Sequence, residues 1–444
     1  MRMLGSKRRP RAAALVLLLA ALSLVVVACG DDESGGGDSG DKAAATPAPT
    51  SDPKCGAGSG EKASGEPIKL GAIATKQPGT DFTDIANTTK AYFDCVNDNG
   101  GVKGRPVEMV IETEQTDPGQ IASLARKLAE TEKVLGIVGS TSIIECAVNH
   151  KYWEDNDFYV INTGIAPECY GTPNSAAVNM GPRYSSDGAT QYVIRQKVDK
   201  IVFDQSNVPG TGYIAAGPSL IAKDAGIPIQ TLKENVPIQD ANSIAVKLTQ
   251  AAGKNGAVVL NFTPPEALKI LQAAQQQGLA DRVKAWACST PCNTDFLAKS
   301  LGTEWDGKLG VNAELNVTDA KGEHSDMYRA VMKKYGKNVT GGLGSFSQMG
   351  FVAGEIAYSA LDSIEGDITK ESVNEAIKNV KGFKTDILCK PWYYGEAPLH
   401  IPNNTDWTTT PKEGKMVIKE ECFPISDVDP AIKQVREIEA EMGL

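Results

Sequence analysis

The chain has 444 residues, with 45 basic and 55 acidic side chains and a net charge of −10. That acidity argues against nucleic-acid binding, which needs a basic surface. Hydrophobic residues make up 41% and charged residues 23% of the chain, as in ordinary soluble globular proteins. Only three histidines are present, which argues against a multi-histidine metal site, and we expect no bound metal or cofactor.

The first 28 residues predict an export signal. Five basic residues lie between Arg2 and Arg11, and an apolar run follows from Ala12 to Ala28. This run is short for a membrane span. It ends in Val26-Val27-Ala28-Cys29-Gly30, which resembles a bacterial lipobox, so we expect cleavage before Cys29 and lipidation of that cysteine. The alternative is an uncleaved anchor helix, but residues 29–65 are polar and of low complexity, as in a flexible tether.

Export also explains the cysteines. The chain has nine, and eight remain if Cys29 carries the lipid, an even number that is typical of disulfides in an oxidising compartment. Sequence alone does not choose among the possible pairings, and we expect each cysteine to pair with its neighbour along the chain. A zinc site is the alternative, although no Cys-x-x-Cys pair occurs. The predicted bridges are Cys55–Cys95, Cys146–Cys169, Cys288–Cys292 and Cys389–Cys422.

Strands and helices alternate from residue 66 onwards. A strand is predicted at 68–73, a helix at 83–97, a strand at 107–111, a helix opening at Asp117-Pro118, and strands at 134–138 and 159–161. The pattern then begins again, with strands at 200–203 and 257–262 and helices at 212–225, 241–252 and 265–277. Because parallel strands need crossover helices, this alternation predicts two α/β lobes, each with a doubly wound parallel sheet.

The later part of the chain is mostly helical, with helices predicted at 327–335, 344–364 and 370–380. It has too few strands for a third lobe, so we expect it to complete the first. Open α/β sheets bind ligands at the carboxyl ends of their strands. The loops to consider are therefore 75–82, 139–142, 163–165, 204–212, 262–265 and 288–292.

Several segments together resemble one known family. They are 68–73, the turn Asn97-Asp98-Asn99-Gly100-Gly101-Val102-Lys103-Gly104, and the segments 116–118, 136–139 and 162–168. In order and spacing they are similar to the branched-chain amino acid (leucine/isoleucine/valine) type of substrate-binding protein that serves ABC importers. This resemblance covers residues 66 to 425.

The resemblance implies a type I periplasmic binding protein fold, with two lobes joined by a three-crossing hinge. Lobe 1 would comprise 66–181 and 318–386, lobe 2 would comprise 182–317 and 387–425, and 426–444 would form a C-terminal helix. The implied function is capture of a small solute outside the cell and its delivery to a permease and its ATPase, by a monomer anchored to the cell membrane.

In that family, hydroxyls and backbone N–H groups of two loops in the first lobe hold the carboxylate of the ligand. Ser142 matches the first hydroxyl, and Thr163 and Gly164 match the second loop. Ile165 stands where the family often has a hydroxyl. Helix capping is the alternative role for Ser142 and Thr163. The residues expected to contact the ligand are Ser142, Thr163, Gly164, Ile165, Asp81, Phe82, Thr141, Gln205, Phe262, Thr263 and Ser289.

The second lobe departs from the family pattern. Val208-Pro209-Gly210 replaces the tyrosine-glycine pair, and the loop 288–292, expected to supply an acid for an ammonium group, has none. Asp81, Asp204 and Asp295 are nearby candidates, for which capping or solvated roles are the alternative. An amide, a carboxylic acid without an amine, or an apolar catabolite would suit such a cleft as well as an amino acid.

Two other functions are weighed against solute transport. An enzyme would need a nucleophile or phosphate motif, and the chain has no G-x-S-x-G, Walker loop or H-E-x-x-H, so we expect no enzymatic activity. A ligand-sensing lipoprotein without a transport role would use the same cleft, and sequence does not separate it from an importer component.

Overall fold

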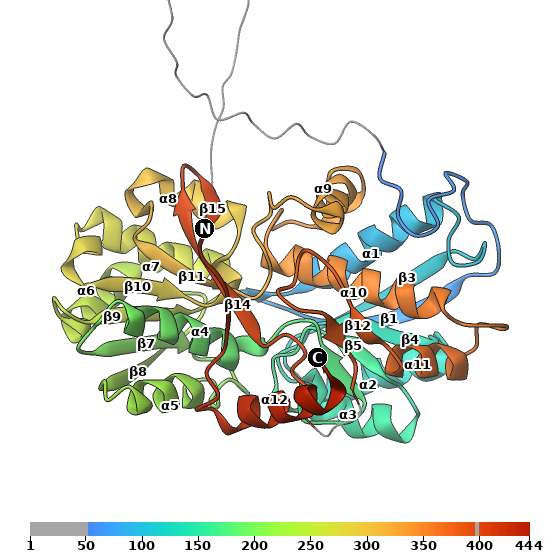
Figure 1. Ribbon diagram of the computed structural model, residues 1–444, viewed down its shortest axis with the longest axis horizontal. Coiled ribbons are helices and arrows are strands. Elements are labelled where there is room, and N and C mark those ends of the chain that lie inside the picture. The colour runs from blue at the N-terminus through green and yellow to red at the C-terminus, as the bar shows by residue number, and fades with distance from the viewer. Residues whose placement is uncertain (1–51, 396–398) are drawn as a thin grey trace, which may run out of the picture. The chain divides into compact units, whose positions relative to one another are not determined.

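The structure is a computed structural model and describes residues 52–395 and 399–444. The predicted export signal and the lipidated Cys29 lie outside these residues. Two α/β lobes make up the described chain, one at the right and one at the left of Figure 1.

The first lobe has a parallel sheet in the strand order β3-β1-β4-β5-β6. One face packs against α1, α9, α10 and α11, and the other packs against α2 and α3. The elements are β1 (Ile68–Gln77), α1 (Thr83–Asp98), β3 (Val107–Glu114), α2 (Pro118–Arg126), β4 (Gly136–Ser140), α3 (Glu145–Asp155), β5 (Val160–Asn162), β6 (Ser175–Ala177), α9 (Glu323–Tyr335), α10 (Ser345–Asp362) and α11 (Lys370–Lys378). A short strand, β2 (Thr80–Asp81), pairs antiparallel with the end of β1.

The second lobe has a seven-stranded sheet in the order β15-β14-β11-β10-β9-β7-β8. Helices α4 and α5 cover one face, and α6, α7 and α8 cover the other. The elements are α4 (Gly181–Arg195), β7 (Ile201–Ser206), α5 (Ala216–Asp224), β8 (Ile229–Glu234), α6 (Ala241–Ala252), β9 (Ala257–Asn261), α7 (Pro264–Gln276), β10 (Ala285–Cys288), α8 (Asp295–Leu301), β11 (Leu309–Ala313), β14 (Thr405–Lys412) and β15 (Lys415–Pro424). The prediction of two doubly wound lobes is confirmed.

Local chemistry explains why several of these elements start where they do. Asp117 caps α2, because its carboxylate accepts the backbone N–H of Gln120 at 2.7 Å, and Pro118 occupies the first turn. The helix then buries Ile121 and Ala125 against the sheet. These are the capping and apolar positions that the sequence pattern predicts.

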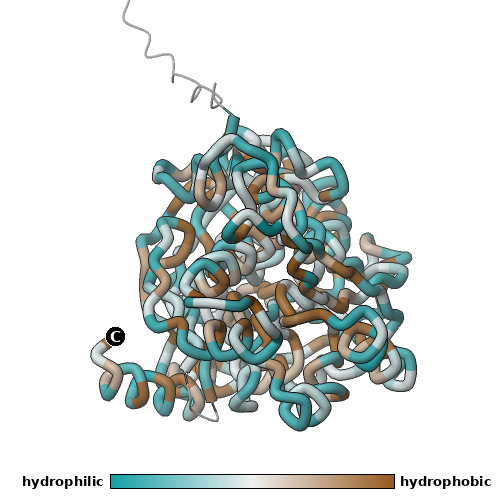
Figure 2. Tube along the Cα trace, turned by 90° about the vertical axis from the view of Figure 1, so that its right-hand side faces the viewer, coloured by the Kyte–Doolittle hydropathy of each residue, from teal (hydrophilic) through white to brown (hydrophobic). Residues whose placement is uncertain are grey.

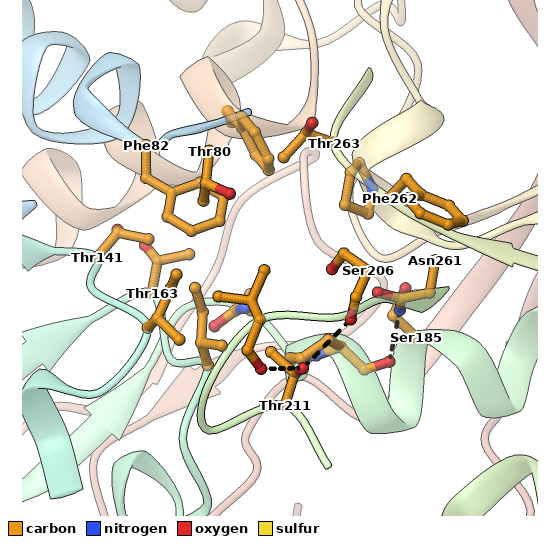
Figure 3. Close-up of a pocket in the computed structure, with 18 of the residues that line it drawn as sticks. Thr80, Phe82, Thr141, Thr163, Ser185, Ser206, Thr211, Asn261, Phe262 and Thr263 are labelled. Atoms are coloured by element: carbon orange, nitrogen blue, oxygen red, sulfur yellow. Dashed lines mark hydrogen bonds between the residues drawn. The ribbon is translucent and has the colours of Figure 1, made fainter. Parts of the chain in front are cut away.

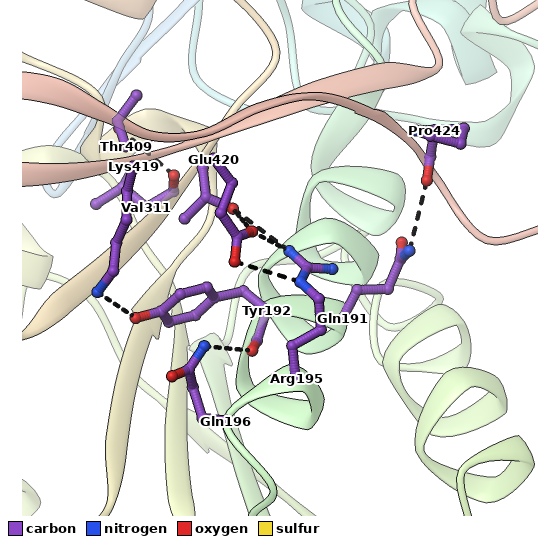
Figure 4. Close-up of polar contacts among 10 residues, drawn as sticks. Gln191, Tyr192, Arg195, Gln196, Val311, Thr409, Lys419, Glu420 and Pro424 are labelled. Atoms are coloured by element: carbon purple, nitrogen blue, oxygen red, sulfur yellow. Dashed lines mark hydrogen bonds and ion pairs between the residues drawn. The ribbon is translucent and has the colours of Figure 1, made fainter.

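The hairpin β14–β15 is not among the predicted strands. Its two-residue turn, Glu413-Gly414, has φ angles of 51° and 77°, the left-handed conformation that tight hairpins require. Side chains of α4 attach β15 to the lobe: Arg195 pairs with Glu420, and Tyr192 accepts a hydrogen bond from Lys419 at 2.9 Å (Figure 4). The hairpin thus extends the second sheet.

The segment before this hairpin lies with the first lobe, which corrects the expected limits of the second lobe, 387–425. Ile387, Leu388 and Trp392 are buried in the core of the first lobe, and the Trp392 indole donates to the carbonyl of Ala177 at 2.8 Å. Trp392 begins the short strand β13 (Trp392–Tyr393), which pairs with β12 (Lys381–Phe383). Apolar aromatic side chains, rather than chain order, decide where this segment packs.

The C-terminal helix α12 (Pro430–Met442) is amphipathic, as the alternating colours near the C label of Figure 2 show. Ile432 and Val435 are fully buried, and they pack beside Tyr170 and Tyr184. Tyr170 lies between β5 and β6 of the first lobe and Tyr184 lies in α4, so the helix contacts residues of both lobes.

The chain passes between the two sheets three times, at Val178–Met180, at Glu314 and at Asn403. The buried side chains of Glu314 and Asn403 hold these crossings together. The amide of Asn403 donates to the carbonyls of Val178 and Glu314, at 3.2 and 3.0 Å. The carboxyl group of Glu314 in turn accepts the backbone N–H of Met180 at 2.5 Å. Each of the three crossings therefore bonds to another, which makes the hinge a single hydrogen-bonded bundle.

Four disulfides join the eight cysteines in the predicted neighbouring pairs, Cys55–Cys95, Cys146–Cys169, Cys288–Cys292 and Cys389–Cys422. Cys55–Cys95 attaches the start of the described chain to α1. Cys389–Cys422 connects the segment that packs on the first lobe with β15 of the second sheet.

Loop closure predicts how much two of these bridges stabilise the fold. Cys55 and Cys95 are 40 residues apart and Cys288 and Cys292 only 4 apart, and all four side chains are buried. Replacing the first pair by alanine should cost roughly 2–4 kcal/mol of unfolding free energy, and replacing the second pair distinctly less, because a long loop restricts the unfolded chain more. Urea unfolding measures both, and an equal loss would contradict the loop-closure explanation.

Glu314 predicts a pH dependence of stability. Burial raises the pKa of its carboxyl group to about 8, so the folded chain keeps a proton there that the unfolded chain releases near pH 4.5. Folding should therefore lose stability as the pH rises from about 4.5 to 8. Glu314→Gln retains the acceptor for Met180 but does not titrate. Urea unfolding at pH 5 and pH 8 compares the variant with wild type. The unfolding free energy of the variant, relative to that of wild type, should be roughly 2–4 kcal/mol more favourable at pH 8 than at pH 5. A difference that is the same at both pH values would show that Glu314 does not titrate in this range.

Candidate functional site

A cavity lies between the two lobes, where the carboxyl ends of both parallel sheets meet (Figure 3). Its volume is about 90 Å³. This is the position at which open α/β sheets bind ligands, because loops and helix ends replace the regular ladder there. The lining residues that follow strands are Thr80, Phe82, Thr141, Ile143, Thr163, Ile165, Ser206, Val208, Phe262, Thr263 and Pro291.

Contacts between the lobes close the cavity on several sides. The hydroxyl of Tyr213, from the second lobe, donates to the carbonyl of Ile165 in the first. Thr263 donates to the carbonyl of Gly79 at 3.4 Å, and the backbone N–H of Ser345 donates to the carbonyl of Asn293 at 3.0 Å. These three bonds join the lobes beside the cavity.

The walls of the cavity are predominantly apolar. Phe82 and Phe346 meet edge to face with ring centroids 5.5 Å apart on the first-lobe side, and Phe262 and Val236 come from the second lobe. Ile85, Ile143, Ile165, Val208, Ile214 and Met349 complete these walls. Such walls favour the hydrocarbon part of a ligand through the hydrophobic effect.

Only one ionisable residue, Glu314, is among the cavity's lining, which contains no lysine, arginine or histidine. This carboxyl group belongs to the hinge and already accepts the N–H of Met180. Its raised pKa, about 8, follows from burial and keeps it uncharged at neutral pH. The cavity thus has no fixed charge of either sign at neutral pH.

Two buried hydroxyl oxygens of the lining have no hydrogen-bond partner among the described residues. They belong to Thr141 and Thr163, which are 3% and 2% exposed and follow the neighbouring strands β4 and β5. Both lie on the same side of the cavity, below Phe82 in Figure 3. By contrast, the hydroxyl of Thr211 donates to the carbonyl of Val208 at 2.6 Å.

Further polar side chains of the lining are bound within the second lobe. The hydroxyl of Ser185 donates to Thr290 at 2.8 Å, and the amide of Asn261 donates to the hydroxyl of Ser186 at 2.7 Å. These groups are therefore less available to a ligand than Thr141 and Thr163, the two buried hydroxyls of the lining that have no partner in the described chain.

The structure brings six of the expected ligand contacts into this cavity: Phe82, Thr141, Thr163, Ile165, Phe262 and Thr263. Asp81 lies in an adjoining outer cavity, where it caps α1 by accepting the N–H of Thr83 at 2.9 Å. Gly164 lies behind the lining, and its N–H already donates to the side chain of Asn179 at 2.7 Å. The backbone donor expected from Gly164 is thus occupied within the protein.

Ser142, Gln205 and Ser289 are also absent from the lining. The hydroxyl of Ser142 donates to Glu114 at 2.8 Å and accepts the N–H of Glu145 at 3.1 Å, so it caps α3. This is the capping role that the sequence left open. Gln205 donates to the carbonyl of Thr211 at 3.1 Å, which supports the loop that carries Val208.

The acidic candidates for an ammonium partner lie away from the inner cavity. Asp204 is buried in β7, where burial raises the pKa of its carboxyl group to about 8. Burial also raises the pKa of Asp295, whose carboxylate accepts a hydrogen bond from Thr318 at 2.7 Å. Neither residue lines the cavity.

Sequence reasoning missed the lining residues that come from α1 and α10. Ile85, Phe346 and Met349 carry apolar helical patterns that core residues show equally well, so no local signal distinguishes them. Val208 and Phe262, in contrast, are apolar residues within two positions of the ends of β7 and β9, where loops are usually polar. Apolar residues at these points were the usable signal.

An outer cavity of about 370 Å³ adjoins the inner one, and Gly79, Thr263 and Phe346 line both. Its acidic residue Asp84 accepts the backbone N–H groups of Thr340 and Gly341, at 2.8 and 2.6 Å. The outer cavity is thus more polar, and Phe346 stands at the boundary between the two.

Comparisons with known proteins agree with this architecture. The profile of a family described as periplasmic binding protein matches residues 67–411. A search of curated proteins found no matching sequence.

Solved structures show the same fold at low sequence identity. A branched-chain amino acid ABC transporter protein from Thermus thermophilus, with bound valine, is 16% identical over 84% of this chain and 99% of that chain, with a TM-score of 0.71. A fatty acid ABC transporter substrate-binding protein from Thermomonospora curvata is 19% identical over 83% of this chain and 95% of that one, with a TM-score of 0.68. A solute-binding protein from R. palustris in complex with benzoate is 15% identical over 80% of this chain and 96% of that chain, with a TM-score of 0.64. The family match and the two-lobed fold confirm the expected assignment: the chain belongs to the periplasmic binding protein family and has its type I fold.

Proposed function

We propose that this chain is the extracytoplasmic solute-binding component of an ABC importer. The observation that carries the proposal is the enclosed cavity at the carboxyl ends of both sheets, beside a hinge of three hydrogen-bonded crossings. Rotation of the lobes about these crossings would open the cavity, admit a solute and close around it. The closed form would then present the solute to a permease and its ATPase.

The side chains at the cavity support binding rather than chemistry. None of the three histidines lines it: His150 contacts the carbonyl of Cys146 in its own helix, His324 pairs with Glu355, and His400 contacts the carbonyl of Thr172. The lining hydroxyls therefore have no neighbouring base of the kind that activates a nucleophile. We accordingly favour a binding protein over a secreted enzyme.

The solute in this proposal is small and amino-acid-like, or a carboxylate or amide. Proteins of this fold have been crystallised with valine, isoleucine and benzoate. The fold thus accepts ligands with and without an amine, and the side chains of the cavity must decide between them.

The same proposal places the protein outside the cell membrane as a lipid-anchored monomer. Residues 52–395 and 399–444 include no helix that is both long and apolar enough to cross a bilayer. The lipobox-like sequence at Cys29 and the polar residues 29–65 support attachment through a lipid and a tether. A ligand-sensing lipoprotein that signals to a membrane partner is the second candidate, since it would need the same cavity and anchor.

Ligand binding should appear as thermal stabilisation. We expect the full-length protein, purified in detergent, to gain about 2.7 kcal/mol of stability at a solute concentration of one hundred times Kd, because the solute binds only the folded chain. A panel of amino acids, amides and organic acids, measured by the shift in Tm, tests this. If no member of a broad panel raises Tm, the solute-binding proposal fails.

Membrane attachment should depend on one cysteine. Cys29→Ala removes the thiol that would carry the lipid, so the variant should shift from the membrane fraction to the soluble fraction or remain as an uncleaved precursor. Fractionation and immunoblotting of cells that express either form measure this, with Ser34→Ala in the predicted tether as the control that keeps the anchor and every disulfide. A Cys29→Ala variant that is processed and membrane-bound like wild type would contradict lipid anchoring.

A further inference from the structure

Thr141 and Thr163 place two unpaired buried hydroxyls at the lining of the inner cavity. Buried hydroxyls in folded proteins are nearly always hydrogen-bonded, and these two have no partner among the described residues. They come from the ends of adjacent parallel strands and lie on one side of the same cavity (Figure 3). Each hydroxyl can donate one hydrogen bond, so together they suit a group with two or more lone pairs, such as a carboxylate or a carboxamide.

The rest of the inner cavity suits a hydrocarbon body. Phe82 and Val236 line it from the two lobes, and the side chains of Ser185, Thr211 and Asn261 are bonded within the protein. A second polar group on the ligand would therefore be buried against apolar walls without a partner, at a cost in binding free energy.

An ammonium group is the clearest case of such a mismatch. It needs a carboxylate or several acceptors, and the only ionisable residue of the inner lining is Glu314. Glu314 accepts the N–H of Met180 at 2.5 Å, and burial keeps it protonated at neutral pH. Three carboxylates line the outer cavity, and each has a partner. Asp81 accepts the N–H of Thr83, Asp84 accepts the backbone N–H groups of Thr340 and Gly341, and Glu266 accepts the N–H of Ile238 and pairs with Lys269. No described carboxylate therefore faces the inner cavity free to receive an amine.

We propose that the ligand of this cavity is an amine-free compound with one carboxylate or carboxamide head, held by the hydroxyls of Thr141 and Thr163, and a branched or aromatic hydrocarbon body. This inference rests on the proposed function and goes beyond it by excluding α-amino acids. Hydroxyl groups hold a carboxylate or an amide without a buried cation, in keeping with a lining that has none.

Matched compounds test the ligand class. The full-length protein in detergent is titrated calorimetrically with 4-methylpentanoate, 4-methylpentanamide and leucine, which share one carbon skeleton, and with 3-phenylpropanoate, 3-phenylpropanamide and phenylalanine. We expect an acid or amide to bind at least tenfold more tightly than its amino-acid counterpart, and the difference between acid and amide identifies the head. Leucine or phenylalanine binding as tightly as its amine-free counterparts would overturn the inference while leaving solute binding intact.

Isosteric variants test the head-group site. Thr141→Val and Thr163→Val replace a hydroxyl by a methyl group of similar shape, so each should weaken binding several-fold, and the double variant at least tenfold. Neither should lower the Tm of the ligand-free protein, because no bond within the protein is lost. Thr249→Val is the control: this buried threonine of α6 bonds only to carbonyls of its own helix and does not line the cavity.

One result would contradict the head-group site and a different result would contradict the proposed function, so the two failures are distinguishable. Unchanged affinity in the double variant would overturn the assignment of Thr141 and Thr163. Failure of every compound, in these series and in the wider panel, to bind or to raise Tm would overturn the proposed function itself.

Discussion

The hydrogen bonds among the three crossings are the constraint on which the rest of this molecule depends. The amide of Asn403 donates to carbonyls in the other two crossings. The carboxyl group of Glu314 accepts a backbone N–H from the first crossing. All three crossings are thus joined by hydrogen bonds at one place between the lobes. Glu314 also lines the cavity, so the hinge and the binding site share a side chain. A ligand that fills the cavity thus acts directly beside the axis of closure.

The two lobes contribute different chemistry to the cavity. The first supplies two buried, unpaired hydroxyls at the ends of β4 and β5, whereas Ser185, Thr211 and Asn261 of the second are bonded within the protein. Both supply aromatic and branched walls. Burial of apolar surface favours closure around a hydrocarbon body whatever its shape, but it does not select a head group. Selectivity therefore comes from the few polar atoms left without partners, and from the penalty on any ligand group that finds none.

Neighbouring residues show how far sequence can go in such a site. Ser142 and Thr141 are adjacent in one loop, and both are small hydroxyl residues suited to a ligand. The backbone turns one toward the cavity and the other into the cap of α3, where it bonds to Glu114. Likewise Phe346 reaches the cavity from a helix more than 200 residues from Thr141 in sequence, and its local pattern is that of a core residue. The segment around Trp392 packs on the first lobe because of its aromatic side chains, although chain order suggested the second.

The sequence by itself determined the α/β alternation, the two lobes, the helix at Asp117 and the strand ends at which the cavity lies; it favoured neighbouring cysteine pairs, which the structure then confirmed. These follow from local periodicity, from capping chemistry and from proximity along the chain, which act over a few residues or close short loops. Tertiary structure alone decided which hydroxyls face the cavity unpaired, that Glu314 joins the hinge, and that no fixed charge enters the lining. Those properties depend on contacts between residues far apart in sequence, because a side chain's partner, and hence its availability to a ligand, is set only when the lobes pack.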